Sequence, residues 1–298
     1  EMRDKNLNGP SKRIILLRHG QAQHNPRAEA EKDAGCSYER FLDLMRQDDC
    51  FDAPLTELGE QQAREATQTF AQHLRGIDLV VSSPLSRALK TADLAYPPRT
   101  ILETKDENAK NTVEAGSSDQ TQKQPLQISA AAASVQPKRI CVEDFREING
   151  WLLNAKRQTR TELQLQHPHW DFSELTETDD TWTDTLEEQE SAAERGYRGL
   201  LWCAARPEQR ILVVAHGGIF RFLKTLHPQV EVRDGRAQAS GEEDTCPRRR
   251  FGNCEMREYL MQWSQLEPQT SGPDRERLRP LISLMEVTPG GEDVPLSL

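Results

Sequence analysis

The chain has 298 residues, of which 36% are hydrophobic and 29% are charged, and its formal net charge at pH 7 is −10. This length suits one α/β domain with insertions, or two small domains. The negative charge argues against non-specific nucleic-acid binding, and no apolar run approaches the roughly 20 residues of a membrane span. A mean hydropathy of −0.76 is polar for a packed domain, so part of the length should lie outside the core.

The cysteines and the N-terminal residues indicate the compartment. Six cysteines are scattered and none forms a C-x-x-C pair, which argues against a zinc site and against a disulfide framework. The N-terminal residues contain no apolar signal region. We therefore expect a cytoplasmic protein, with the nucleus as the other compartment consistent with these features.

The first predicted strand ends in chemically active residues. Ile14–Leu17 is an unbroken apolar run, typical of a strand covered on both faces, and Arg18, His19 and Gly20 follow at once. Ligands of open α/β sheets bind beyond the carboxyl ends of the strands. The fork of Arg18 matches phosphate oxygens, and His19 can act as a base or nucleophile near neutral pH. Gly20 would let the backbone turn sharply and approach a ligand closely.

A helix and a second strand are predicted after the first site segment. Residues 26–53 read as a surface excursion over the site with a short helix at Tyr38–Arg46, and Thr56 is a credible N-cap of the next helix. The apolar positions of that helix are Leu58, Ala63, Ala66, Phe70 and Leu74. Ile77–Val81 reads as a buried strand.

A second arginine follows this strand. Ser83 can cap a helix whose first residue is Pro84, which would place Arg87 in the first helical turn, where free N–H groups attract anions. For an arbitrary helix, a solvated arginine would be the usual interpretation.

Residues 103–138 lose periodicity and read as an insertion, after which Arg139–Val142 forms a short strand. Three acids follow this strand and compete for a catalytic role: Glu143, Asp144 and Glu147. A glutamate that acts as an acid near neutral pH needs partial desolvation, which Ile148 and Trp151 would provide for Glu147.

The segment 150–185 reads as a cap with a helix over 158–166. His167 and His169 are spaced like a metal-ligand pair, but a polar loop is the better interpretation. The run 171–194 holds ten acids and no lysine or arginine, which is typical of a solvated face.

The last third repeats the pattern of the opening. A long helix over Leu186–Ala205 precedes the apolar strand 210–215, and His216 and Gly217 then open another helix. His216 is either a satisfied buried histidine or a second site residue. Phe251–Trp263 and Leu281–Val287 read as late strands.

These motifs, in this order, resemble the histidine phosphatase superfamily, which includes the phosphoglycerate mutases. They are Arg18-His19-Gly20-Gln21, Ser83-Pro-x-x-Arg87, Arg146-Glu147-x-x-Gly150 and Val-x-His216-Gly217-Gly. The resemblance runs from about residue 13 to 257, interrupted by the insertions. Asp-Phe-Ser-x-x-x-Glu-Thr-Asp-Asp from residue 171 and Asn253-Cys-Glu-Met-Arg257 are similar to the plant and fungal phosphoglycerate mutase-like subgroup.

The resemblance implies an α/β fold, a three-layer sandwich with a mostly parallel central sheet flanked by helices. It implies one domain at 12–288 with insertions at about 26–53, 103–138 and 150–185, and flexible ends at 1–11 and 289–298. In the implied reaction, His19 takes a phosphoryl group and passes it to water, with Glu147 as general acid and base and no metal or cofactor. The implied phosphate-binding residues are Arg18, Arg87, His216, Asn25, Gln21 and Gly217.

The acid segment departs from the mutase pattern Glu-Arg-x-Tyr-Gly-x-Leu, which favours a phosphatase acting on a small phosphorylated substrate. Two alternatives stay open: a phosphoglycerate mutase with a long-lived phosphohistidine, and a non-catalytic binding protein on the same fold. We expect neither a nucleic acid nor a membrane as partner. The sequence names neither the substrate nor the oligomeric state.

Overall fold

The computed structural model describes residues 9–98, 136–234, 249–264 and 279–287. The predicted insertion at 103–138 lies almost entirely outside these residues, as do the predicted flexible end at 289–298 and most of that at 1–11. Within the described part, no helix is long and apolar enough to cross a membrane.

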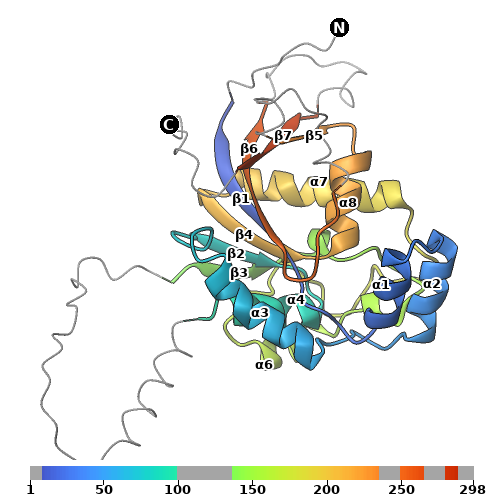
Figure 1. Ribbon diagram of the computed structural model, residues 1–298. Coiled ribbons are helices and arrows are strands. Elements are labelled where there is room, and N and C mark those ends of the chain that lie inside the picture. Colours follow the sequence, from blue (N-terminus) through green and yellow to red (C-terminus); the bar gives the residue numbers. More distant parts are fainter. Residues whose placement is uncertain (1–8, 99–135, 235–248, 265–278, 288–298) are drawn as a thin grey trace, which may run out of the picture.

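A seven-stranded sheet forms the centre of the molecule, in the order β3-β2-β4-β1-β6-β7-β5 (Figure 1). Its strands are β1 (Ser11–Arg18), β2 (Leu79–Ser82), β3 (Lys138–Cys141), β4 (Arg210–Ala215), β5 (Val230–Asp234), β6 (Met256–Trp263) and β7 (Ile282–Val287). Among these strands only β6 runs antiparallel to its neighbours, β1 and β7. The expected mostly parallel sheet is confirmed.

Helices cover both faces of this sheet. They are α1 (Pro26–Asp33), α2 (Tyr38–Gln47), α3 (Glu57–Thr69), α4 (Ser86–Ala95), α6 (Arg160–Gln166), α7 (Gln189–Ala205) and α8 (Gly217–Leu226), with 3₁₀ turns η1 (Glu143–Phe145) and η2 (Leu153–Ala155). In Figure 1, α3 and α4 lie on one side of the sheet and α7 and α8 on the other. The three-layer α/β sandwich predicted from the sequence is therefore present.

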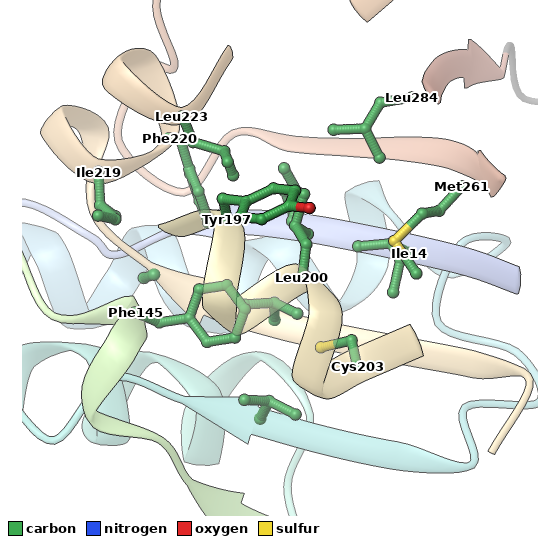
Figure 2. Close-up of a cluster of buried hydrophobic side chains, with 14 of the residues drawn as sticks. Ile14, Phe145, Tyr197, Leu200, Cys203, Ile219, Phe220, Leu223, Met261 and Leu284 are labelled. Atoms are coloured by element: carbon green, nitrogen blue, oxygen red, sulfur yellow. The ribbon is translucent and has the colours of Figure 1, made fainter. Parts of the chain in front are cut away.

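The apolar run of β1 divides its side chains between two cores. Ile14 and Leu16 pack in the cluster that holds Tyr197 of α7 (Figure 2), whereas Ile15 and Leu17 pack in the cluster on the α3 and α4 side. Successive strand residues point to opposite faces, so a strand buried on both faces needs an unbroken apolar run. Each fully buried side chain of this size contributes about 1.5–3 kcal/mol.

Several boundaries differ from the sequence-based predictions. β1 begins at Ser11, inside the predicted flexible leader 1–11, because Ser11 pairs with Gln262 of β6. Helix α3 ends at Thr69 rather than near residue 74, and Leu58 is 49% exposed instead of packing in the core. Strand β5 was not predicted.

The start of α4 is a further correction. The helix begins at Ser86 rather than at Pro84, and its free N–H groups are served by Asp52, whose Oδ1 accepts from the Ser86 backbone N–H at 2.9 Å. Ser83 therefore stays outside the helix. Arg87 still lies in the first helical turn, as predicted. The Thr56 cap is confirmed, since its hydroxyl accepts from the Gly59 N–H at 3.0 Å.

Two of the predicted insertions form ordered structure beside the site. The helix expected at Tyr38–Arg46 is confirmed as α2, and with α1 it encloses a small apolar cluster of Ala28, Leu44, Met45 and Leu152. The helix expected at 158–166 is α6, which starts with a capping box of Thr159 and Glu162.

The acidic run 171–194 is more than a solvated face. Asp179 forms an ion pair with Arg146 at 2.7 Å, and Glu187 forms one with Arg195 at 2.6 Å. His167 and His169 both contact Asp93 of α4, which ties their loop to the helix. In the residues that the structure describes, no three or more His, Cys, Asp or Glu side chains gather into a metal-binding group.

Candidate active site

His19 follows the last residue of β1 and is only 2% exposed. Its backbone N–H donates to the Ala215 carbonyl at 3.0 Å, and its ring Nδ1 lies 2.6 Å from the Gly20 carbonyl oxygen. A carbonyl only accepts, so Nδ1 carries the proton and Nε2 keeps its lone pair. Burial, with the charges of Arg87 and Arg18, holds the pKa of His19 well below its usual value. The ring is therefore neutral near pH 7.

His216 ends the neighbouring strand β4 and caps α8. Its ring meets the ring of His19 edge-on, with centroids 4.9 Å apart. Its Nε2 lies 2.7 Å from the hydroxyl of Ser83, which follows β2, the next strand across. Three adjacent parallel strands thus deliver Ser83, His216 and His19 to one edge of the sheet. Burial, with nearby Arg87, lowers the pKa of His216 well below its usual value.

Arg18 is held at the cavity by groups from two other segments. Its Nη1 donates to the Phe251 carbonyl at 2.8 Å, and its Nη2 forms an ion pair with Glu29 of α1. Its Nε is buried and has no partner. A Cβ on Gly217 would lie 3.2 Å from that Nε, so glycine gives the guanidinium room against the start of α8.

Arg87 is fully buried, and it lies beneath the cavity rather than on its wall. Its Nη1 donates to the Asn154 carbonyl at 2.7 Å, while Nε and Nη2 have no partner. Burial lowers the pKa of this guanidinium to about 10, and the carboxylate of Asp52 opposes that shift. Arg87 is still charged at neutral pH.

Two polar residues stand beside these arginines. Asn25 lines the cavity, and its side-chain amide donates to His24 Nε2 at 3.1 Å. His24 is 2% exposed, and its Nδ1 has no partner. Neither His24 nor the place of Ser83 in this site was predicted from the sequence. The polar run after β1 was the one signal for His24, and no local pattern pointed to the pairing of Ser83 with His216.

Glu147 reaches the cavity from the loop after η1 and sits at the first turn of α8. Its Oε2 accepts from the Gly218 N–H at 3.1 Å and its Oε1 from the Ile219 N–H at 3.0 Å. Two backbone donors at a helix N-terminus suit an ionised carboxylate. Ile148 lines the cavity as expected, but Trp151 packs beside the α1–α2 cluster, so the predicted cover by Trp151 is wrong.

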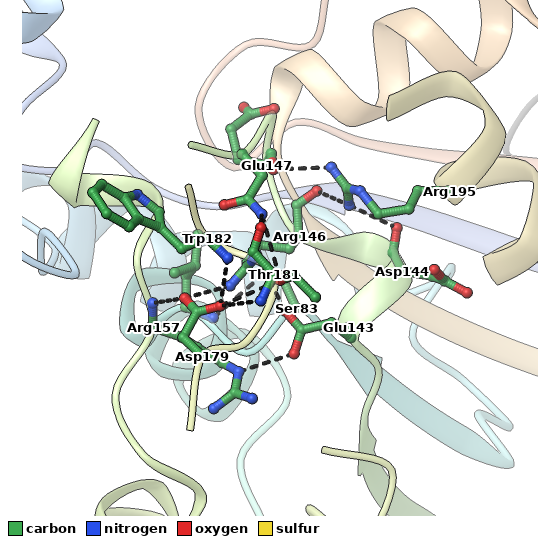
Figure 3. A network of polar contacts seen from close by, with 12 residues as sticks. Ser83, Glu143, Asp144, Arg146, Glu147, Arg157, Asp179, Thr181, Trp182 and Arg195 are labelled. Carbon is green, nitrogen blue, oxygen red and sulfur yellow. Dashed lines mark hydrogen bonds and ion pairs between the residues drawn. The ribbon is translucent and has the colours of Figure 1, made fainter. Parts of the chain in front are cut away.

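A polar network fixes the loop that carries Glu147 (Figure 3). Arg195 of α7 donates to the carbonyls of Arg146 at 2.8 Å and of Glu147 at 3.1 Å. The other two acids of this segment are engaged elsewhere: Glu143 pairs with Arg157 and Asp144 with Arg198. Of the three competing acids, Glu147 is the one that lines the cavity.

The cavity has a volume of about 370 Å³. Arg18, His19, Asn25, Glu147 and Gly217 line it, and Arg87 and His216 are buried behind its wall.

Two motif residues serve packing instead. Gln21 does not line the cavity, because its side-chain oxygen accepts from the Thr56 hydroxyl at 3.0 Å. Gly20 allows a close approach to a helix and not to a ligand, since a Cβ there would lie 2.4 Å from the Gly59 carbonyl oxygen of α3.

Comparison with known proteins gives the same family as the motifs. The model of the histidine phosphatase superfamily, branch 1, matches residues 14–111. Phosphoglycerate mutase-like protein 1 of Arabidopsis thaliana is 31% identical over 261 residues, which cover 84% of this chain and 81% of that protein. This chain belongs to the histidine phosphatase superfamily. A second Arabidopsis thaliana phosphoglycerate mutase-like protein is 32% identical, over 71% of this chain and 73% of its own.

Among solved structures, a mycobacterial glucosyl-3-phosphoglycerate phosphatase is 18% identical, with a TM-score of 0.39 over 93% of this chain and 100% of its own. The membership of this chain in the superfamily rests on its sequence relatives.

Proposed function

We propose that this protein is a metal-independent phosphatase that hydrolyses a phosphate monoester through a phosphohistidine on His19. The observation that carries the proposal is a group of buried polar nitrogens without partners at one site. Among the residues that the structure describes, the nitrogens without a partner at this site are Arg18 Nε, Arg87 Nε and Nη2, His24 Nδ1 and His216 Nδ1. Buried polar groups are almost always paired, so a ligand rich in acceptor oxygens would complete this set. A phosphoryl group carries such oxygens and the negative charge that two guanidiniums favour.

The first step is transfer to the histidine. The lone pair of His19 Nε2 attacks phosphorus, the P–N bond forms, and the ester P–O bond breaks. The Nδ1–H remains hydrogen-bonded to the Gly20 carbonyl oxygen, and this bond holds the ring in the productive tautomer. Arg18, Arg87 and His216 stabilise the charge on the equatorial oxygens, which is the main task of an enzyme in phosphoryl transfer.

Glu147 would transfer a proton in both steps, first as general acid and then as general base. It starts as a carboxylate on the α8 N-terminus, so the proton for the leaving oxygen would enter with the substrate as its monoanionic ester. Glu147 passes that proton to the leaving oxygen and then accepts one from the water that attacks the phosphohistidine. The P–N bond breaks and His19 returns to its neutral form. Glu147 then gives its proton to the departing inorganic phosphate and is again a carboxylate, so that the monoanionic ester and water yield the alcohol and the phosphate monoanion.

The depressed pKa of His19 supports this cycle. Phosphate monoesters take up their second proton near pH 6, where an ordinary histidine would already be half protonated. Because burial holds the pKa of His19 well below its usual value, a neutral nucleophile can coexist with protonated substrate. We expect kcat/KM to rise as the pH falls from 8 toward 6.

The test is hydrolysis of p-nitrophenyl phosphate between pH 4 and 8 in the presence of a chelator. Turnover should persist without metal and fall by about a thousandfold in His19→Ala. The matched control is His169→Ala, which removes a histidine away from the cavity and should leave the rate unchanged. Acid-quenched wild type should carry phosphate on His19, detected by mass spectrometry.

Two results would contradict the proposal. Turnover that a chelator abolishes would refute the metal-independent mechanism, and equal rates for wild type and His19→Ala would refute the nucleophile. A phosphohistidine that outlives many turnovers, with activity that depends on a bisphosphate primer, would instead establish the mutase alternative.

A further inference from the structure

Three basic side chains line the same cavity as His19 but play no part in the reaction described above. Lys32 comes from the last turn of α1, Arg221 from α8, and Arg250 from the loop before β6. The three belong to segments far apart in the sequence. The fold therefore gathers three positive charges at the mouth of a site that already holds Arg18 and Arg87.

In the part of the chain that the structure describes, none of these three cations forms a salt bridge with an acid. Burial, then the charges of Arg250 and Arg221, lower the pKa of Lys32, and Cys36 and Glu39 oppose this shift, so both arginines lie near enough to the lysine to repel it. Cations held close together repel one another, which lowers the stability of the folded protein, and together they attract an anion.

The acids on the cavity wall are already engaged or exposed. Glu29 contacts Arg18 and Asn253, and Glu147 contacts the backbone of α8. Asp33 also lines the cavity but is exposed at the end of α1.

The loop that carries Arg250 is held in place by β6. The guanidinium of Arg257 donates to the carbonyls of Arg249, at 2.9 Å, and Arg250, and it lies 4.0 Å from the centre of the Phe251 ring. Lys224 of α8 donates to the same Arg249 carbonyl at 3.3 Å. The loop is thus connected to β6 and to α8.

Apolar side chains line the same cavity as these cations and the reacting groups. Phe41, Leu42 and Met45 of α2 and Phe251 line the cavity together with the polar residues. Lys32 Nζ lies 4.8 Å from the centre of the Phe41 ring. A cavity of about 370 Å³ falls within the range of pockets that enclose whole organic ligands.

We infer that the substrate carries a second anionic group on an apolar body, and that Lys32, Arg221 and Arg250 bind this group while the reacting phosphate reaches His19. The inference rests on the proposed function for the position of the first phosphate. The second anion is a carboxylate or a phosphate, because lysine and arginine side chains bind both groups. Two separated anionic ends would also fix the orientation of the substrate.

Binding of non-hydrolysable probes tests this inference without relying on catalysis. Phenylphosphonates with a para carboxylate, a para phosphonate or a para carboxamide, and their biphenyl counterparts, would be titrated calorimetrically into the full chain. The carboxamide has nearly the shape of the carboxylate without its charge. We expect at least one of the doubly anionic probes to bind the wild type tenfold or more tightly than its carboxamide isostere.

The charge-removing variant is Lys32→Met with Arg221→Gln. We expect the preference for the second anion to fall to about twofold or less, while phenylphosphonate binds as before. The matched control is Arg64→Gln with Lys90→Gln, which removes two exposed cations of α3 and α4 and should retain the preference. Thermal unfolding of each variant checks that it is folded, and the single variants Lys32→Met and Arg221→Gln replace the double variant if it is not.

The outcomes separate this inference from the proposed function. A wild type that binds charged and uncharged probes equally, or binds none of them, overturns the inference, as does a charge-removing variant that keeps the preference. A further outcome is that the protein hydrolyses phenyl phosphate as fast as 4-carboxyphenyl phosphate, 1,4-phenylene bisphosphate and their biphenyl counterparts. That outcome would support the proposed phosphatase activity and contradict the second anion site. Selective binding without any turnover would leave the second site standing on a binding protein.

Discussion

Glu29 of α1 forms an ion pair with the guanidinium of Arg18, one of the two arginines that we propose bind the phosphate. The same carboxylate accepts a hydrogen bond from Asn253 at 3.1 Å. An acid therefore sits on the proposed phosphate-binding edge of the site. An incoming phosphate has to share or displace this contact.

We expect Glu29→Gln to strengthen phosphate binding. Glutamine keeps an acceptor for Asn253 but removes the negative charge that competes with the ligand. The loss of one such partly exposed charge is worth about 1 kcal/mol, so inhibition by inorganic phosphate should improve roughly fivefold. Competitive inhibition constants for wild type and variant provide the measurement. Weaker inhibition in the variant would show that Glu29 orients Arg18 instead of competing for it.

The contact between Gly218 and Glu147 leads to a second prediction. A Cβ at Gly218 would lie 2.2 Å from Glu147 Oε1, so Gly218→Ala must displace the carboxylate. We expect kcat to fall by about tenfold or more while the fold is retained, because alanine is a better helix former than glycine. In a double-mutant cycle with Glu147→Ala, the alanine at 218 should add little further loss. Fully additive losses would mean that the two residues act independently.

Ser83 gives a third prediction, because its hydroxyl is the partner of His216 Nε2. We expect Ser83→Ala to lower kcat about tenfold, since the ring then loses the hydrogen bond that sets its tautomer. Ser82→Ala is the matched control. Ser82 is equally buried, but its hydroxyl bonds only to the Ser83 carbonyl, at 2.9 Å. Equal losses in the two variants would make the effect one of packing rather than of the His216 contact.

The buried histidines predict a loss of stability in acid. Burial and the nearby arginines lower the pKa values of His19, His24 and His216 well below their usual values in the folded state. The unfolded chain takes up protons below about pH 6.5 that the folded chain excludes, so the free energy of unfolding decreases as the pH falls. Each histidine should contribute about 1 kcal/mol of this decrease between pH 7 and pH 5.5.

Urea unfolding at pH 7 and pH 5.5 measures this effect. His24→Asn should show a smaller decrease than the wild type, because one excluded proton is removed from the folded state. An equal decrease in both proteins would show that His24 titrates alike in the folded and unfolded chains.

Much of the site was predictable because it lies at the ends of strands. The apolar runs before His19 and His216 are long enough to indicate buried strands, and parallel strands bring their carboxyl ends to one edge. Arg87 was predictable for a related reason, because the short helix after β2 starts at that same edge. The start of α4 was wrong because Asp52, from a distant segment, serves its N–H groups in place of Ser83.

Other parts of the site depend on contacts between distant segments. Gln21 follows His19 by two residues, yet it turns to Thr56 and leaves the cavity. Trp151 was expected to shield Glu147 from solvent, but its ring packs against the apolar cluster of α1 and α2 instead. In both cases the competing partner lies more than thirty residues away or in another layer, where local patterns carry no information.

The amino-acid sequence by itself indicated the family through its motifs, and with the family a mostly parallel sheet and the candidate residues His19, His216, Arg18 and Arg87, because strand-end motifs are local. Only the tertiary structure decided that Glu29 rests on Arg18, that Ser83 holds His216, and that Lys32, Arg221 and Arg250 converge on one cavity. The physical reason is that these contacts join segments whose separation in space is set by how the layers pack. The local sequence around each of these residues gives no information about that separation.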